Sequence, residues 1–411
     1  MKIGLIGFGQ AGGKITQELV LYDQNNNTKI VEEALAINSA RSDLQGLTHI
    51  QDDHKQVIGT QEVKGHGVGA DNELGAKVAE NDIDQIMNSV SDFPTHKIDA
   101  FVITTALGGG TGSGGSPVLA EHLQQRYDSI PTYIIGVLPG NEGGLPSLNA
   151  ARSFKTCIDK SDGMIMFDNQ SWQTAGESSE SGFKKMNEQL VERIGMLFSA
   201  GEVTDPSIVG ETVVDASEIQ NTLGTRNIET GGVTTIGFSK IPIPDEELSN
   251  SGGLLSRLRG GSSSNSSGSI DEESVQNTNR IIRSVKDAVN GKLTLPCDIT
   301  TTQRALVVTA GPPDKLNRKG LEEAKQWVEE ETETLEVRSG DFPLPNEDHI
   351  YGIVVLSGVS KSNRIKEIQD VGARAKASKE ELNNNIDDDL DNLLGTTEEN
   401  EEDQNEIEEL F

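Results

Sequence analysis

Short hydrophobic runs alternate with stretches of helical hydrophobic spacing along the first 170 residues of the chain. Runs of this length, bounded by glycine or polar residues, are typical of strands that are buried on both faces. The predicted strands cover residues 2–7, 34–37, 98–106, 133–138 and 163–167. Strands that alternate with helices form parallel sheets covered on both sides, so the pattern predicts an α/β fold with a doubly wound parallel sheet.

The pattern changes after the last of these strands. Residues 181–200 carry hydrophobic side chains at helical spacing, which predicts the longest helix of the body. Residues 247–271 are rich in Ser, Gly and Asn, which predicts a flexible loop. A second, smaller α/β domain is expected from two helical and two strand-like segments, at 274–289, 320–330, 305–309 and 350–356.

The stretch from Thr104 to Pro117 carries the strongest chemical signal. Five glycines fall within seven of its residues, and two hydroxyl side chains lie among them: Gly108, Gly109, Gly110, Thr111, Gly112, Ser113 and Gly114. Glycine lets the backbone approach an oxygen closely, and the free N–H groups of a helix that begins at Pro117 attract negative charge. We predict a phosphate cradle; a flexible surface turn is the alternative, although turns seldom need so many glycines. Gly115 stands where a Walker P-loop has its lysine, which excludes that motif.

A second glycine loop, at residues 7–13, follows the first predicted strand. Gly7, Gly9 and Gly12 satisfy the dinucleotide fingerprint, so an NAD-dependent oxidoreductase has to be considered. That fingerprint requires an acidic residue at the end of the second strand, where this chain has Asn38. Two glycine loops at strand ends suit a mononucleotide with a long phosphate tail, held between them, better than they suit NAD.

Two further loops follow the same pattern. Small residues at 65–73 would let backbone N–H groups reach a terminal phosphate, although the loop could simply be a glycine-rich start of a helix. Glu142 follows the strand at 133–138 and could accept a hydrogen bond from a ribose hydroxyl, or it could be an ordinary exposed glutamate. Ligands of doubly wound sheets lie at the carboxyl ends of the strands, so we expect these loops to converge.

The helix at 181–200 offers a possible contact for a nucleotide base. Phe183 and Asn187 are four residues apart, so they lie one above the other on the helix surface. A ring could stack on a base, and an amide offers one donor and one acceptor, which suits the edge of guanine. Packing in the core is the alternative for Phe183 and the more frequent fate of such a side chain.

Asp215 and Glu218 are three residues apart and share a face if their segment is helical. Two carboxylates on one face could orient and polarise a water molecule. Without further context, a solvated helix face is the more frequent explanation.

The net charge of the chain limits the kinds of partner that it can bind. The 411 residues carry a formal net charge of −31, and both the body and the last residues are acidic. This favours a protein of a very salty environment over an ordinary acidic protein, and it excludes nucleic acid as a partner. The six histidines have no metal-ligand spacing, and neither a signal peptide nor an apolar membrane span is visible. With only two cysteines, Cys157 and Cys297, we expect a reducing cytoplasm.

The motif GGGTGSG at 108–114 resembles the signature of the tubulin/FtsZ superfamily, and the remaining loops resemble it in order over about residues 1–370. The acidic body and the long Ser/Gly loop are most similar to the CetZ group, the FtsZ/tubulin-like proteins of halophilic archaea that are linked to cell shape. The resemblance implies that GTP or GDP is bound by Gly9, Gln10, Ala11, Gly12, Asn38, Ala70, Asp71, Asn72, the 108–113 turn, Asn169, Phe183 and Asn187. Glu142 joins these expected nucleotide contacts through its place after the strand at 133–138. A phosphate cradle without lysine also implies Mg²⁺.

The resemblance also implies a head-to-tail homopolymer. Asp215 and Glu218 match the family's catalytic carboxylates, which contact the nucleotide of the next subunit, so GTP hydrolysis would need assembly. Val213 stands where the family usually has asparagine, which bears on turnover rate. The alternatives are an FtsZ-like division GTPase and a nucleotide switch that does not polymerise.

These expectations divide the chain into four parts. We expect a GTPase domain at 1–180, a central helix with the catalytic loop at 181–223, a C-terminal α/β domain at 224–371, and a disordered acidic tail at 372–411. The tail offers a possible contact with a membrane surface or an adaptor protein.

Overall fold

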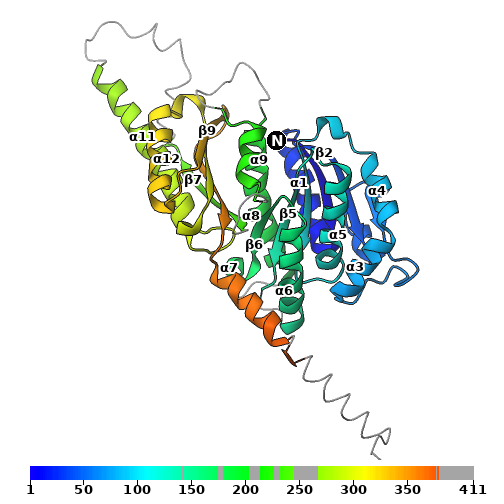
Figure 1. Cartoon of the computed structure of the whole chain (residues 1–411). Helices are drawn as coiled ribbons and strands as arrows, with labels where there is room; N and C mark the ends of the chain where they lie inside the picture. Colours follow the sequence, from blue (N-terminus) through cyan, green and yellow to red (C-terminus); the bar gives the residue numbers. More distant parts are fainter. Residues whose placement is uncertain are drawn as a thin grey trace, which may run out of the picture.

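The computed structural model of the chain describes residues 1–140, 143–174, 179–202, 213–225, 232–244, 267–375 and 377–378 (Figure 1). Three predictions concern residues that lie wholly or largely outside these ranges. They are the ribose contact of Glu142, most of the loop at 247–271, and most of the acidic tail.

Within the described residues, one sheet of ten strands runs in the order β3-β2-β1-β4-β5-β6-β7-β10-β8-β9. Neighbouring strands from β3 to β6 are parallel, whereas β10 is antiparallel to both β7 and β8. The two halves of the sheet meet between β6 and β7, where a single pair, Ile165 and Thr234, is in register. The strands are β1 (Ile3–Phe8), β2 (Val31–Asn38), β3 (Lys55–Val57), β4 (Ala100–Ala106), β5 (Thr132–Leu138), β6 (Gly163–Asp168), β7 (Val233–Pro242), β8 (Arg304–Gly311), β9 (Val337–Pro343) and β10 (His349–Val359).

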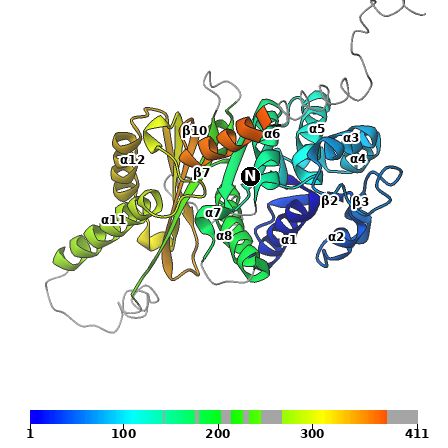
Figure 2. The same ribbon diagram turned by 90° about the horizontal axis from the view of Figure 1, so that it is seen from below.

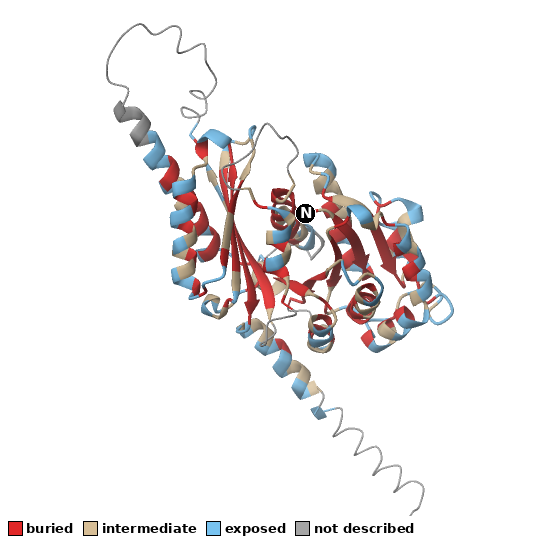
Figure 3. Cartoon of the chain, turned by 45° about the horizontal axis from the view of Figure 1, so that its top comes forward, coloured by how far each residue is buried: buried red, intermediate tan, exposed pale blue. Residues whose placement is uncertain are grey.

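Helices cover both faces of the parallel half, as the doubly wound pattern predicts (Figure 3). Successive side chains of a strand point to opposite faces, so Leu5 packs with the helices of one face and Ile6 with those of the other. One face holds α1 (Gly9–Asn26), α8 (Ser179–Ala200) and α9 (Ala216–Leu223), with α1 beside α8 (Figure 2). The other holds α3 (Asn72–Asn81), α4 (Ile83–Ser91), α5 (Thr111–Arg126) and α6 (Gly144–Asp159).

The mixed half of the sheet has its own helices and its own hydrophobic cluster. Two of them, α11 (Ser267–Asn290) and α12 (Arg318–Thr332), pack on β8 and β10. A last helix at 363–375 then crosses back and lies beside α6, seen in orange in Figure 1. There a Cβ added at Gly372 would be only 2.5 Å from the Cβ of Ala151.

Several element predictions need correction. Helix α5 begins at Thr111 and contains Pro117, because packing against α3 holds a glycine-rich segment helical despite its poor propensity. Helix α11 has 24 residues against 22 for α8, and it begins at Ser267, inside the segment predicted as a flexible loop. Strands β3, β7 and β9 were not predicted, and the helix at 363–375 continues past the expected start of the tail at 372.

Candidate functional site

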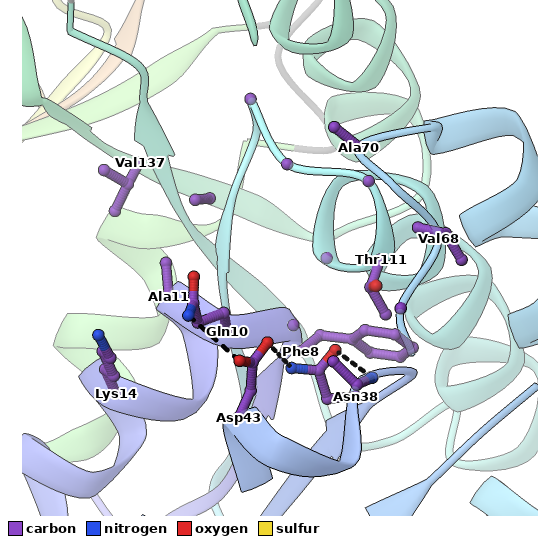
Figure 4. Close-up of a pocket in the computed structure, with 18 of the residues that line it drawn as sticks. Phe8, Gln10, Ala11, Lys14, Asn38, Asp43, Val68, Ala70, Thr111 and Val137 are labelled. Carbon is purple, nitrogen blue, oxygen red and sulfur yellow. Dashed lines mark hydrogen bonds between the residues drawn. The ribbon is translucent and has the colours of Figure 1, made fainter. Parts of the chain in front are cut away.

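The carboxyl ends of β1, β2, β4 and β5 surround a cavity of about 450 Å³ (Figure 4). The predicted loops converge on it, as expected for a parallel sheet. Thirteen of the sequence-predicted nucleotide residues line the cavity: Gly9, Gln10, Ala11, Asn38, Ala70, Gly108, Gly109, Gly110, Thr111, Gly112, Asn169, Phe183 and Asn187.

The glycine turn and the start of α5 form one wall of the cavity. Helix α5 has 16 residues and begins at Thr111, so its first N–H groups have no partner within the helix. The Thr111 hydroxyl is 2.6 Å from the Ser39 hydroxyl, which ties the start of α5 to the end of β2. The wall combines a helix N-terminus with side-chain-free backbone, and this arrangement binds anions.

Four predicted residues lie next to the cavity without lining it. Gly12 packs α1 against β4: a Cβ added there would be 2.2 Å from the Thr104 carbonyl oxygen. The Asp71 carboxylate caps α3 through the Leu74 N–H at 3.0 Å, and the Asn72 amide oxygen is 3.4 Å from Arg152 Nη1. The Ser113 hydroxyl donates to the Gly109 carbonyl. These four residues stabilise the loops that form the cavity wall without contacting the cavity themselves.

Asp43, on the short helix α2 (Arg41–Gln45), is a cavity residue that the sequence did not reveal. Its carboxylate accepts hydrogen bonds from Gln10 Nε2 at 3.2 Å and from Asn38 Nδ2 at 3.1 Å, drawn as dashed lines in Figure 4. It therefore orients two amides that reach the cavity from different elements, Gln10 from the start of α1 and Asn38 from the end of β2. Lys14 also lines the cavity; its position four residues after Gln10 on α1 is the signal that could have found it.

Phe183 and Asn187 approach the cavity from α8. Core packing was the more frequent explanation for Phe183, but the side chain is 40% exposed and faces the cavity. Asn169 reaches the same side from the start of α7 (Asn169–Trp172). This side of the cavity thus offers a ring and two amides.

The last helix braces this wall from outside. Arg364 donates from Nε to the buried Asp168 carboxylate at 3.0 Å and from Nη2 to the Pro139 carbonyl oxygen at 2.6 Å. Asp168 also caps α7, and Pro139 lines the cavity. One arginine thereby ties the ends of β5 and β6 together. Sequence reasoning missed it because 196 residues separate it from Asp168.

Asp215 and Glu218 lie at the start of α9 and do not line the cavity. They form a capping box, in which Asp215 accepts from the Glu218 N–H at 2.9 Å and Glu218 accepts from the Asp215 N–H at 3.4 Å. Hydrogen bonds from the Ser217 hydroxyl and the Glu218 N–H lower the pKa of Asp215. Partial burial raises the pKa of Glu218, and the charge of Asp215 adds to that effect, whereas the Asp215 N–H and Arg338 act against it.

The last two strands of the sheet order, β8 and its edge neighbour β9, hold α9 and the segment before it. The backbone of Val213 pairs with Asp341 on β9. Arg304 of β8 donates from Nη1 to the Gly224 carbonyl at 2.5 Å and the Asn221 carbonyl at 3.2 Å, which satisfies the C-terminal end of α9. The orientation of the two carboxylates is thus set by the mixed half of the sheet.

Two family descriptions cover nearly the whole chain. Residues 2–177 match "Tubulin/FtsZ family, GTPase domain", and residues 176–374 match "Tubulin-like CetZ, C-terminal domain". The chain is 49% identical over 383 residues to "Tubulin-like protein CetZ1" of Haloferax volcanii, which covers 93% of this chain and 94% of that protein. It is 30% identical over 370 residues to "Tubulin-like protein CetZ" of Pyrococcus abyssi, which covers 90% of this chain and 88% of that protein.

The comparison with solved structures agrees with these family matches. A GDP-bound monomer of CetZ1 from Haloferax volcanii superposes with a TM-score of 0.78 at 44% identity, covering 92% of this chain and 100% of that one. A GTPγS-bound protofilament of CetZ2 from the same organism gives 0.78 at 36% identity, with the same coverage. An empty FtsZ dimer from M. jannaschii gives 0.64 at 21% identity, covers 87% of this chain and 88% of that one, and shows the fold alone. The predicted fold class is confirmed.

Proposed function

The chain belongs to the CetZ group of the tubulin/FtsZ family, and from that premise we propose that it binds GTP, assembles head to tail and hydrolyses GTP between subunits, in the control of cell shape. The separation of the cavity from Asp215 and Glu218 carries the proposal. Helix α8 runs between them: its residue Phe183 lines the cavity, and the carboxylates follow its far end. From Phe183 to its end at Ala200 the helix rises about 26 Å, so in this proposal a second subunit supplies the carboxylates.

In this proposal the triphosphate lies against the turn at 108–112 and the start of α5, and the loop at 67–70 closes on its last phosphate. The base stacks on Phe183, with Asn187 at its edge, and Asn169 and Glu142 serve the ribose. Gln10, Asn38 and Asp43 form the side of the site between these two ends.

The residues fit a magnesium ion that travels with the nucleotide. Mg²⁺ keeps several waters and takes few protein ligands where phosphates are available. Asp43 is the carboxylate among the residues that line the cavity, and both of its oxygens already accept amide hydrogen bonds. The amide oxygen of Gln10 points away from Asp43 (Figure 4). This oxygen would be the protein atom that coordinates the magnesium ion. When bound, the ion would neutralise phosphate charge in a cavity whose described lining residues include one lysine, Lys14, and no arginine.

GTP turnover per subunit should rise steeply above a threshold protein concentration. The reason is that a site completed by a neighbour acts only in the polymer. The measurement is phosphate release against protein concentration in multimolar KCl with Mg²⁺. A measurable rate that stays flat would mean that each chain hydrolyses alone, and the reading of a nucleotide switch without polymers would replace this proposal.

Turnover in the assembled state should fall on acidification at a higher pH than an ordinary glutamate would give. Glu218 acts ionised in this proposal, and a raised pKa means that it takes up its proton earlier as pH drops. Activity is therefore present above that pKa and lost below it. Arg338→Met removes a positive charge that lowers this pKa, so the midpoint of the kcat profile should move further up. An unchanged midpoint in that variant would contradict the assignment.

The remaining expectations stay predictions. They include the cytoplasmic location, a contact of the acidic tail with a membrane or adaptor, and the division of the chain at residues 180 and 223. Among the helices that the structure describes, none is both long enough and apolar enough to cross a bilayer. An FtsZ-like role in division would require the same site, so it differs from the proposal in the cellular process served.

A further inference from the structure

Asn149, on the second turn of α6, is almost wholly buried, with 1% of its surface exposed. Its Nδ2 donates to three backbone carbonyl oxygens, those of Ala70 at 2.7 Å and of Gly108 and Gly109 at 3.2 Å each. All three acceptors belong to residues that line the cavity, whereas Asn149 itself does not. A single side chain from behind the wall therefore joins the loop at 67–70 to the glycine turn.

The hydrogen bonds decide which way the backbone of the turn faces. In a trans peptide unit the carbonyl oxygen and the following N–H point in opposite directions. The carbonyl oxygens of Gly108 and Gly109 point toward Asn149, because they accept its hydrogen bonds. The N–H groups of Gly109 and Gly110 therefore point away from Asn149. Among the described residues these two N–H groups have no backbone acceptor, so they are available to a phosphate.

Ala70 adds a second constraint. It is one of the non-glycine residues with positive φ, at 62°, a conformation that costs energy for a residue with a Cβ and persists only where the surroundings enforce it. The hydrogen bond from Asn149 to its carbonyl is the shortest of the three. The loop also touches the turn, because a Cβ added at Gly110 would be 2.9 Å from the Ala70 backbone.

We infer that Asn149 is a positioning residue that fixes the loop at 67–70 against the glycine turn and thereby sets the preference of the site for a nucleoside triphosphate over a diphosphate. The inference rests on the proposed function. Without this amide, Ala70 is free to leave its strained conformation and the loop moves away from the third phosphate. The start of α5 still holds the inner phosphates, so the diphosphate loses less.

The test compares Asn149→Asp with a matched control, Ser153→Ala. Aspartate has the shape of asparagine but presents an oxygen, in place of the amide donor, to three carbonyl oxygens. Ser153 lies one turn further along α6, is buried, and donates to the Leu107 carbonyl at 3.2 Å without reaching Ala70. Equilibrium affinities for GTPγS and for GDP are measured by displacement of a fluorescent GDP, and the melting temperature reports folding.

Asn149→Asp should lower the affinity for GTPγS about 10- to 100-fold and that for GDP by a clearly smaller factor. Ser153→Ala should leave the ratio of the two affinities unchanged even if it lowers the melting temperature. If Asn149→Asp fails to fold, Asn149→Ser, a shorter donor, should show the same change of ratio at a smaller size.

Equal losses for both nucleotides, or the same change of ratio in Ser153→Ala, would overturn the role of Asn149 and leave the proposed function standing. Failure of the unaltered chain to bind either nucleotide would overturn the proposed function as well, and the first measurement separates the two cases.

Discussion

Replacing Glu218 with glutamine should lower GTP turnover about a hundredfold or more, while nucleotide binding and assembly persist. Glutamine at the third position of a helix can still accept the hydrogen bond from the Asp215 N–H, so the capping box survives. What is lost is the negative charge that would orient the attacking water in the site of the next subunit. In phosphoryl transfer the protein contributes mainly by positioning and charge, so removing this group affects the rate and spares affinity.

The measurement is phosphate release together with sedimentation of polymer at the same protein concentration. Glu322→Gln on α12 makes the same chemical change on a half-exposed side chain outside α9 and should behave like the unaltered chain. Normal turnover by Glu218→Gln would remove its catalytic role. Loss of polymer together with turnover would instead assign Glu218 to the contact between subunits.

The second large effect is expected from Gly110→Ala. The added Cβ would be 2.6 Å from Val68 Cγ2 and 2.9 Å from the Ala70 backbone, so the loop at 67–70 has to move. Crowding of this kind costs about 1–3 kcal/mol, and 1.4 kcal/mol is a factor of ten in affinity. The displaced loop forms part of the cavity, so we expect a roughly 5- to 150-fold loss of GTP affinity, measured by displacement of a fluorescent nucleotide.

Gly144→Ala is the control for this substitution. An added Cβ at Gly144 meets no atom within 4 Å among the residues that the structure describes, and the residue does not line the cavity. Its GTP affinity should match that of the unaltered chain. Unchanged affinity in Gly110→Ala would mean that the loop at 67–70 does not contact the nucleotide.

The sequence predicted the parallel half of the sheet well, apart from the short edge strand β3, because each of the other strands there contains a hydrophobic run and is followed by a helix. Strands β7 and β9 were not predicted, for different reasons. Residues at the end of β7 are only partly buried, and β9 is an edge strand with a mixed pattern of burial. Neither shows the hydrophobic run that marks a strand buried on both faces.

The candidate site was predictable where a loop directly follows a strand, as with Asn38 and the glycine turn. Asp43 and Arg364 were not predictable, because the fold brings each of them to the site from another element. Pattern alone also left the place of Phe183 open, since a helical stripe of hydrophobic residues does not say which member leaves the core. Packing decides whether the side chain of a loop residue faces the cavity or the elements behind the cavity wall. Ser113 and Asn72 were predicted to line the site, but their side chains bond to Gly109 and Arg152 instead.

The glycines that pack one element on another have a consequence for the history of such proteins. A Cβ at Gly114 would be 2.2 Å from the Asn72 carbonyl oxygen on α3, and one at Gly75 would be 2.3 Å from that of Gly110. Neither glycine lines the cavity, so selection for folding alone would preserve them. A descendant that had ceased to use a nucleotide would therefore keep Gly114 of the signature, together with Gly75. The motif therefore records shared ancestry and close packing of α3 and α5 as firmly as it records an activity.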